Sequence, residues 1–328
     1  MGVRAGAALS PARAIVTGVG GQDGSYLAEL LLDRGYEVVG VVRDATRDYP
    51  NLLAVRDRIQ VVQVDLLDRT ALPVVLREHA PQEVYNLASP SFVPRSWEYP
   101  VETAEFAAVG VTSLLEAIRA VDPSIRVYQA SSSEIFGEPG ETPQTESTPL
   151  APVTPYGVAK AYGHFIIGSY RRRYGLHASA GILYNHESPR RPLDFLPSKV
   201  AHGVAAIASG REVELVLGDL DAQRDWGYAR DYVEAMWRIV QQDEPRDYVI
   251  ATGELHSVRE LVDVAFAHVG LDWREHVRVD ESLKRGQAEL HRLVGDAATA
   301  REKLDWAPTV SFDELVGLLV DAAGESVS

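Results

Sequence analysis

The stretch AIVTGVGGQDGS, residues 14–25, holds three glycines at three-residue spacing between a short apolar run and an amphipathic segment. Phosphate oxygens can reach backbone N–H groups where no Cβ intervenes, and a helix that follows directs the positive end of its dipole at a pyrophosphate. Glycine also marks ordinary turns, but this position between a strand and a helix favours a nucleotide-binding loop. The predicted loop residues are Gly18, Gly21, Gln22, Asp23 and Gly24.

Outward from this loop, short apolar runs bounded by turn residues alternate with longer amphipathic stretches. This alternation is typical of βαβ units and predicts a parallel sheet with helices on both faces. The expected fold class is therefore α/β, a Rossmann-like doubly wound parallel sheet. The expected strands are 14–17, 37–42, 59–64, 83–87, 126–130 and 178–184, and the expected helices are 26–34, 72–79, 101–121 and 156–174.

Beyond residue 185 the alternation loosens, and helical stretches are expected at 198–210, 257–269 and 312–323. This pattern predicts a smaller, interleaved C-terminal substrate-binding domain with a cleft between it and the sheet. Residues 1–184 and about 224–251 are assigned to an NAD(P)-binding domain. Residues from about 185 to 223, together with 252–328, are assigned to the substrate domain.

The 328-residue chain is 46% hydrophobic and 24% charged, values that fit a folded globular protein and exclude a disordered one. Because it has no cysteine, disulfides, thiolate metal sites and a cysteine nucleophile are excluded. A formal charge of −15 disfavours nucleic acid and anionic membranes as partners, and no apolar run is long enough for a membrane helix. We expect a cytoplasmic protein. We also expect no metal site, because His186 beside Glu187 lacks further ligands at a suitable spacing.

A second pattern, Y-x-x-x-K, is formed by Tyr156 and Lys160 at the start of an expected helix, where both side chains lie on one face. A nearby ammonium favours tyrosinate, which makes Tyr156 a usable general base toward a sugar hydroxyl, and Lys160 can also bind a nicotinamide ribose. Upstream, the strand 126–130 leads into Ser132 and Glu134, at the edge where doubly wound sheets place their chemistry. A polar loop with a solvated Glu134 is the structural alternative.

These segments together resemble the extended short-chain dehydrogenase/reductase family and, within it, the GDP-mannose 4,6-dehydratases. The resemblance extends from residue 14 to about residue 322, and GQDGSYLAE and NHESPRR are far more specific than the generic superfamily motifs. The segments that carry it are TGVGGQDGSYLAELL (17–31), QASSSEIFG (129–137), TPYGVAK (154–160), GILYNHESPRR (181–191), LGDLDAQRDWGYARDYV (217–233) and DYVIATGELHSVRELV (247–262).

The resemblance implies conversion of GDP-D-mannose to GDP-4-keto-6-deoxy-D-mannose, a redox-neutral dehydration with a bound nicotinamide cofactor. In this scheme Tyr156 takes the 4-hydroxyl proton as hydride leaves C4, and Glu134 removes the C5 proton. Water then leaves C6 with help from Ser132 and Glu134 before the hydride returns to C6. Glu134 discriminates this reaction from simple dehydrogenation, which needs no carboxylate beside the tyrosine. Serine stands at position 132 where the family usually has threonine, and the hydroxyl is retained.

For the cofactor, Arg43 follows the second expected strand, where a dinucleotide fold reads the ribose. Arginine suits a 2′-phosphate and so favours NADP, whereas the neighbouring Asp44 keeps NAD as the alternative. The other predicted cofactor residues are Asp65, Leu66, Leu87, Ala88, Tyr156 and Lys160.

An acidic protein must neutralise a nucleotide-sugar diphosphate locally, and arginine can hold phosphate with two hydrogen bonds. The predicted substrate residues are Asn185, Arg191, Lys199, Arg224, Arg285 and Glu289. Around the last two, the family's R-P-A-E segment appears as RGQAE at 285–289, without its proline and with the arginine one residue out of step.

Other functions remain open on the same residues. An NDP-sugar epimerase, a 4-keto reductase or a dehydratase of a different NDP-hexose would also use Tyr156 and Lys160, and a dinucleotide-binding sensor or structural protein would need no catalysis. Net NADPH consumption separates a reductase from a dehydratase. Relatives form dimers or tetramers through helices of the sheet domain, so a homodimer or homotetramer is expected through 101–121 and 156–174.

Overall fold

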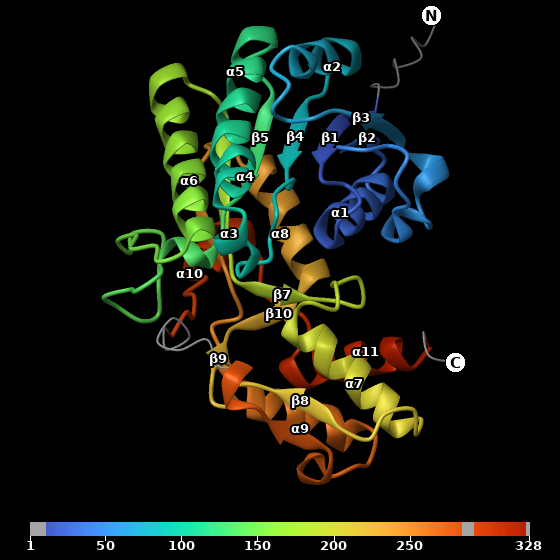
Figure 1. Ribbon diagram of the computed structural model, residues 1–328. Coiled ribbons are helices and arrows are strands. Elements are labelled where there is room, and N and C mark those ends of the chain that lie inside the picture. The colour runs from blue at the N-terminus through green and yellow to red at the C-terminus, as the bar shows by residue number, and fades with distance from the viewer. Residues whose placement is uncertain (1–10, 284–291, 326–328) are drawn as a thin grey trace, which may run out of the picture.

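A seven-stranded parallel sheet lies at the centre of the computed structural model, which describes residues 11–283 and 292–325 (Figure 1). The strand order is β11-β6-β5-β4-β1-β2-β3. The chain adds β2 and β3 on one side of β1 and the later strands on the other side, so the order reverses at β1. In such sheets ligands bind outside the carboxyl ends of the strands at this switch point. The strands are β1 (Arg13–Thr17), β2 (Glu37–Val42), β3 (Gln60–Gln63), β4 (Glu83–Asn86), β5 (Arg126–Ala130), β6 (Ala178–Leu183) and β11 (Tyr248–Ile250).

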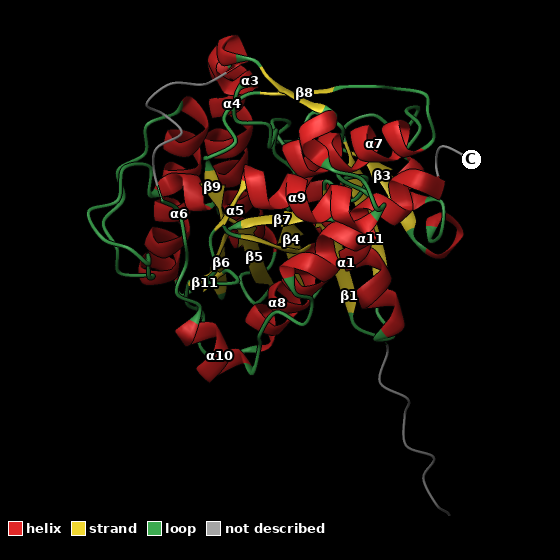
Figure 2. Ribbon diagram, turned by 90° about the horizontal axis from the view of Figure 1, so that it is seen from below, coloured by secondary structure: helices red, strands yellow, loops and turns green. Residues whose placement is uncertain are grey.

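Helices cover both faces of the sheet, as Figure 2 shows from below. The central strands β4 and β6 are buried along their whole length, as expected for parallel strands covered on both faces. One face carries α1 (Gln22–Asp33), α8 (Ala229–Gln241) and α10 (Ala298–Leu304), and the other carries α2 (Ala71–His79), α5 (Val111–Val121) and α6 (Pro155–Tyr174). Short 3-10 turns lie at Pro50–Leu52, Arg56–Arg58, Ser133–Ile135, Trp273–Glu275 and Glu281–Leu283.

The helix expected at 101–121 is interrupted in the structure. After α3 (Arg95–Glu98), α4 (Pro100–Ala104) leads into a π-helical segment, Glu105–Gly110, before α5 begins. Helix α6 approaches closely here, since a Cβ on Gly163 would lie 3.0 Å from the Ala107 carbonyl oxygen. The apolar pattern indicated one helix because a widened turn leaves no mark on the hydrophobic periodicity over so short a stretch.

A second core lies below the sheet in Figure 1, where α7 (Leu196–Ala208), α9 (Val258–His268) and α11 (Phe312–Glu325) pack on one another. The short strand β7 begins two residues after β6 ends, so it carries the chain from the carboxyl edge of the sheet toward this core. Three two-stranded pairs lie outside the main sheet: β7 (Asn185–Glu187) with β10 (Trp226–Tyr228), β8 (Leu215–Leu217) with β13 (Val277–Val279), and β9 (Gln223–Arg224) with β12 (His256–Ser257).

The α/β prediction is confirmed, and the strands expected at 37–42 and 126–130 have the predicted bounds. The elements that were missed include α3, α8, β11, α10 and the short paired strands that follow β6. The buried residues Tyr232, Met236 and Ile239 of α8 recur at helical spacing, so its signal was present in the sequence. Within the described ranges, the helices are all too short or too polar to cross a membrane.

Candidate active site

The glycine loop joins β1 to α1 at the carboxyl edge of the sheet, beside the switch point. Gly18 has a φ of 68°, and a Cβ there would lie 2.9 Å from the Cα of Ala88. A Cβ on Gly24 would collide with the Gly18 carbonyl. Helix α1 begins at Gln22 with Gly21 as its N-cap, so its unpaired N–H groups end at this loop. A backbone cradle at a helix N-terminus fits the pyrophosphate of a dinucleotide.

Tyr156 and Lys160 lie in the first turns of α6. The helix starts here because Thr154 Oγ1 accepts a first-turn N–H at 2.9 Å and Pro155 occupies a position that needs no donor. Tyr156 is 7% exposed and Lys160 is 6% exposed. The lysine Nζ lies 5.6 Å from the tyrosine ring centroid and donates to the carbonyl oxygen of Ala130 at 3.0 Å.

Ser132 and Glu134 follow β5 in a tight turn. Ser132 Oγ accepts the N–H of Glu134 at 3.3 Å, and its hydroxyl is also hydrogen-bonded to Tyr156. A Cβ on Gly157 would come within 2.6 Å of the Glu134 carbonyl oxygen, so the turn and the start of α6 touch directly. The structure therefore brings together all four residues that the sequence predicted to be catalytic.

Burial controls the ionisation of the tyrosine and the lysine. Burial raises the pKa of Tyr156 to about 12; the Ser132 hydrogen bond opposes this rise, and the charge of Glu134 adds to it. Burial also lowers the pKa of Lys160 to about 8, with Asp23 acting in the opposite direction. At neutral pH the site holds a neutral phenol near an ammonium, and additional positive charge is needed to ionise the phenol.

The two most specific sequence motifs, GQDGSYLAE and NHESPRR, contact each other. Gln22 Nε2 donates to the His186 carbonyl oxygen at 3.1 Å, and Gln22 Oε1 accepts from the Ser188 hydroxyl at 2.7 Å. Asp23 Oδ2 lies 2.9 Å from Nε2 of His186. Gln22 and Asp23 therefore fix the glycine loop to the segment 185–191.

His186 is held as an imidazolium. Its Nε2 faces the Asp23 carboxylate, and its Nδ1 lies 2.7 Å from the Tyr184 carbonyl oxygen. Because both neighbours are acceptors, both ring nitrogens carry protons. Burial raises the pKa of Asp23, but the pairing with His186 outweighs it and brings that pKa down to about 2. The pKa of His186 is raised by the same pairing despite its burial.

The two arginines of this segment have different partners. Arg191 Nε lies 3.2 Å from Glu187 Oε2, and the arginine is close enough to Tyr156 to lower its pKa. Glu187 is 1% exposed, and burial raises its pKa although Arg191 opposes this. Arg190 turns back to α1 and pairs with Glu29. Of the two, Arg191 is the one that faces the predicted catalytic residues.

The other predicted substrate residues within the described ranges lie on three elements that follow β6. Asn185 opens β7, Arg224 is on β9, and Lys199 is in α7. The guanidinium of Arg224 donates to a neighbouring backbone carbonyl at 2.7 Å, and Lys199 Nζ donates to a β8 carbonyl at 2.9 Å. Arg285 and Glu289 lie outside the described residues.

Beside Arg224, the buried Asp225 is a residue that the sequence reading missed. Its carboxylate accepts from the N–H and hydroxyl of Thr252 at 2.9 and 2.6 Å, from the N–H of Gly253 at 3.0 Å and from the N–H of Gly295 at 3.3 Å. Asp225 therefore joins three segments at one point next to the arginine. The QRDWG motif contained the residue, but its partners lie far along the chain.

The predicted adenosine-side residues are exposed to different degrees. The Arg43 side chain is 62% exposed and lies 3.5 Å from Glu102. Asp65 is exposed and accepts a backbone N–H of the turn after β3 at 2.9 Å, whereas Leu66 is buried. Arg43 and Asp65 thus present their charges to solvent at the carboxyl ends of β2 and β3.

Leu87 and Ala88 follow β4, and their N–H groups both donate to the Thr17 hydroxyl at 3.1 Å. Thr17 begins a buried polar row with Asn86 and Gln129, which the sequence reading missed. Each of the three was interpreted only as part of a strand. Their mutual contacts depend on the register of β1, β4 and β5, which cannot be predicted from the sequence.

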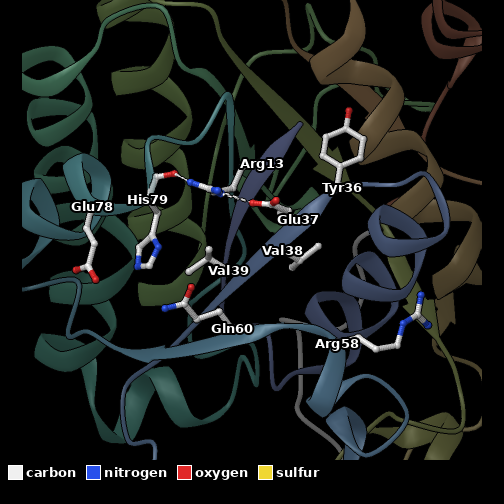
Figure 3. Close-up of a pocket in the computed structure, with 9 residues that line it drawn as sticks. All are labelled: Arg13, Tyr36, Glu37, Val38, Val39, Arg58, Gln60, Glu78 and His79. Atoms are coloured by element: carbon white, nitrogen blue, oxygen red, sulfur yellow. Dashed lines mark hydrogen bonds and ion pairs between the residues drawn. The ribbon is translucent and has the colours of Figure 1, made fainter. Parts of the chain in front are cut away.

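A cavity of about 500 Å³ lies at the opposite, amino-terminal edge of the sheet (Figure 3). Arg13 projects into it, but Nε of Arg13 donates to Glu37 at 2.8 Å and Nη1 donates to the His79 carbonyl at 2.6 Å. The residues drawn in Figure 3 include no predicted site residue. Among the described residues, no cluster of three or more His, Cys, Asp or Glu side chains suits a metal ion.

A doubly wound sheet whose carboxyl edge joins a glycine loop to a Ser, Glu, Tyr and Lys cluster defines the class of extended short-chain dehydrogenases/reductases. The dTDP-glucose 4,6-dehydratase DesIV of Streptomyces venezuelae, solved with NAD and TYD bound, matches with a TM-score of 0.84 and 25% identity over 95% of this chain and 97% of that chain.

Sequence comparison narrows the class. The family model described as GDP-mannose 4,6 dehydratase matches residues 15–319. GDP-mannose 4,6 dehydratase 1 of Arabidopsis thaliana is 44% identical over 94% of this chain and 88% of its own length. The human GDP-mannose 4,6 dehydratase is also 44% identical, over 94% of this chain and 90% of its own length. The chain belongs to the GDP-mannose 4,6-dehydratase family.

Proposed function

We propose that this protein converts GDP-D-mannose to GDP-4-keto-6-deoxy-D-mannose by oxidation at C4, loss of water across C5 and C6, and return of hydride to C6. The observation that carries the proposal is the grouping of Ser132, Glu134, Tyr156 and Lys160 where β5 ends and α6 begins. A carboxylate beside the phenol supplies the second base that dehydration needs and simple dehydrogenation does not.

The residues around the glycine loop fit a nicotinamide cofactor. Gly18 and Gly24 leave no room for a Cβ, and the N-terminus of α1 adds its dipole, as a pyrophosphate requires. Lys160 is buried beside the end of β5 and would bind the nicotinamide ribose. When bound, the cofactor accepts a hydride from C4 and later returns it to C6.

Tyr156 takes the proton of the 4-hydroxyl. Its phenol is neutral at pH 7 because burial raises its pKa to about 12, so nearby positive charge must lower that value during the reaction. The Lys160 ammonium already lies near the phenol and the Ser132 hydroxyl holds it in place, so the further positive charge would come with the bound cofactor, whose oxidised nicotinamide ring is cationic. In this arrangement Tyr156 acts as a base only when the cofactor and the substrate are both bound.

Glu134 acts once C4 is a ketone. The carbonyl acidifies the C5–H bond, and the Glu134 carboxylate takes that proton and gives it to the departing 6-hydroxyl, which leaves as water. C5 takes up a proton as the hydride adds to C6, and this uptake balances the proton that Tyr156 took from the 4-hydroxyl. Two observations support this assignment: the backbone carbonyl of Glu134 packs against Gly157, and the charge of the Glu134 carboxylate raises the pKa of Tyr156.

We assign NADP as the preferred cofactor, with NAD as the alternative. The support is the exposed guanidinium of Arg43 at the end of β2, where a 2′-phosphate would lie. Glu102, at 3.5 Å, neutralises it only weakly in water. Comparison of turnover with catalytic NADP⁺ and catalytic NAD⁺ decides between the two.

The GDP moiety is assigned to the substrate domain expected from the sequence, residues from about 185 to 223 together with 252–328, and to the adjoining Arg224. Arg224 is the main diphosphate ligand in this proposal, because a guanidinium can grip phosphate with two bonds and Asp225 anchors its strand. The remaining assigned ligands are Asn185, Arg191, Lys199, Arg285 and Glu289.

We further propose a homodimer, or a homotetramer built from such dimers, through α4 and α6. Along α6, Val158, Tyr162 and Phe165 are 55%, 45% and 60% exposed and recur on one face. Trp97 and Val101, before and in α4, are 65% and 69% exposed. An apolar surface of this kind is typical of a contact with another protein chain.

The deciding experiment is incubation of the purified protein with GDP-mannose and catalytic NADP⁺, followed by the product mass and the net NADPH. Loss of one water without net NADPH supports the dehydratase. Stoichiometric consumption of NADPH on a 4-keto sugar nucleotide would support a reductase instead, and an isomeric product of unchanged mass would support an epimerase. If GDP-mannose returns unchanged, UDP- and dTDP-hexoses identify a dehydratase of another NDP-hexose.

A further inference from the structure

A buried polar row crosses the sheet under the glycine loop. Thr17, Asn86 and Gln129 are neighbours in register on β1, β4 and β5, and they are 1%, 2% and 5% exposed. Polar groups inside a sheet cost free energy unless each is hydrogen-bonded. Their partners therefore determine what the row does.

The direction of each bond in the row is fixed. Thr17 Oγ1 accepts two backbone N–H groups from just beyond β4, so its own proton goes to Asn86 Oδ1 at 2.7 Å. The amide nitrogen of Asn86 then donates to Gln129 Oε1 at 2.7 Å. This leaves the amide nitrogen of Gln129 to donate to the Ala130 carbonyl oxygen at 3.0 Å. The row thus ends at the carbonyl that also holds the buried lysine.

That carbonyl is available because the row diverts a ladder bond. If the regular hydrogen-bond pattern between the parallel strands β4 and β5 continued, the N–H of Ala88 would donate to the Ala130 carbonyl oxygen. Instead it donates to Thr17. The Ala130 oxygen therefore accepts from two side chains, Gln129 Nε2 and Lys160 Nζ, both at 3.0 Å.

We propose that Gln129 is a positioning residue for Lys160: it occupies one side of the Ala130 carbonyl oxygen and directs the ammonium along the other, toward Tyr156. Lysine carries three rotatable donors on a flexible stem, so one fixed acceptor direction restrains it strongly. The inference rests on the proposed function, in which Lys160 assists Tyr156 and binds the cofactor ribose.

Two substitutions at position 129 test the proposal. Gln129→Met keeps the length of the side chain and removes both amide bonds, whereas Gln129→Glu adds a carboxylate near the ammonium. Gln144→Met is the matched control, because Gln144 is 0% exposed and its Oε1 accepts from Tyr184 and from the N–H of Val294, away from the lysine. All three variants lose amide hydrogen bonds of a buried glutamine.

The first readout needs no turnover: NADPH affinity is measured by fluorescence as a function of pH. Affinity falls as pH rises through the pKa of Lys160, which burial sets at about 8 and which the charge of Asp23 raises in part. Gln129→Glu should move the midpoint of this fall upward by about one pH unit, because the new carboxylate stabilises the ammonium. Gln129→Met should weaken NADPH binding at pH 7 by about fivefold or more.

The second readout is kcat/KM for GDP-mannose. Gln129→Met should lower it by about tenfold or more, because the phenol loses the aligned ammonium. Gln144→Met should leave kcat/KM and the NADPH midpoint within about twofold of wild type while lowering the melting temperature.

Two results would overturn the proposal: Gln129 variants with the wild-type NADPH midpoint and kcat/KM, or equal shifts in Gln144→Met. Thr17 gives a rescue test, since Thr17→Ser keeps the hydroxyl that diverts Ala88 and should retain the wild-type midpoint, while Thr17→Val should behave like Gln129→Met. If the wild-type protein dehydrates no GDP-mannose, the proposed function fails, and the NADPH titration still decides the role of Gln129.

Discussion

Gly157 lies against Glu134 so closely that a Cβ on the glycine would be 2.6 Å from the carbonyl oxygen of the glutamate. The residue before Gly157 is Tyr156, and the residue two before Glu134 is Ser132, which is hydrogen-bonded to that tyrosine. A single backbone contact therefore sets the distance between the two groups that the proposed reaction uses as bases. Glycine is required there by space, since its φ is not unusual.

Gly157→Ala should push α6 away from the Glu134 turn. We expect kcat for dehydration to fall by about tenfold or more, because small displacements of reacting groups are costly, and the free energy of unfolding to fall by about 1–3 kcal/mol. Gly168→Ala, in the same helix, is the control, because its nearest neighbour is the flexible Arg172 side chain at 3.3 Å. Urea denaturation and steady-state kinetics measure both. Equal activity of the two variants would refute the contact's role in geometry.

Glu134→Gln should abolish dehydration while sparing cofactor binding, because an amide cannot take the C5 proton. We expect turnover of GDP-mannose to fall by about 10²-fold or more with unchanged NADPH affinity. Glu138→Gln, an exposed carboxylate four residues along, is the control. Turnover of Glu134→Gln within about threefold of wild type would reject the assignment.

Lys160→Met should stabilise the protein at pH 7 and inactivate it. The folded-state pKa of about 8 lies below the ordinary lysine value of 10.5, so the unfolded chain binds more protons between these values and stability rises with pH across that window. Removing the buried charge should therefore raise the free energy of unfolding at pH 7 by about 2 kcal/mol.

The gain in Lys160→Met should shrink as the pH approaches 10.5, because the folded lysine is neutral above about pH 8 and removing the proton of the unfolded lysine costs less as the pH rises toward 10.5. Urea titrations at pH 7 and pH 9.5 measure this difference, with the exposed Lys199→Met as the control. A loss of stability at pH 7 would mean that the bond to the Ala130 carbonyl outweighs the burial of the charge.

Asp225→Asn should weaken GDP binding through Arg224. An amide cannot accept all four donors that meet the carboxylate, so the β9 strand should loosen and GDP affinity should fall by about tenfold. NADPH affinity should stay within about twofold. In an Arg224→Ala background the substitution should have no further effect on GDP affinity, which isothermal titration checks as a double-mutant cycle. Additive losses would show that Asp225 acts elsewhere.

Phe165→Glu should dissociate the proposed dimer, because it places a charge at the centre of the apolar α6 face. Sedimentation velocity should then report a monomer. Leu193→Glu changes an equally exposed side chain, at 59%, on another part of the surface and should leave the assembly intact. A Phe165→Glu protein that sediments like wild type would place the subunit contact on a different face.

The fold and the catalytic grouping were accessible from the sequence because both depend on local signals. Alternating apolar and amphipathic stretches determine the sheet, and Tyr156 and Lys160 are brought together by helical spacing alone. Ser132 and Glu134 join them because β5 ends and α6 begins at the same edge of the sheet. The short distance between Glu134 and Gly157 could not be predicted, since it depends on how α6 packs.

What the sequence did not reveal depends on contacts between distant segments. Asn86 and Gln129 were interpreted as ordinary strand residues, because only the register of β4 against β5 makes them neighbours. Asp225 was passed over for the same reason, since its donors lie at Thr252 and Gly295. Both cases concern buried polar side chains, whose partners can be assigned only once the chain is folded.

The tie between the glycine loop and the segment 185–191 has a consequence for chimaeras of related enzymes. Gln22 and His186 lie 164 positions apart, and Gln22 and Ser188 lie 166 apart. Any crossover between them would unite halves from two parents, and a mismatched pair would leave a buried amide or imidazolium without its partner. Parents that share both motifs keep this contact after a crossover in the interval, whereas parents that differ in either one must exchange the two together.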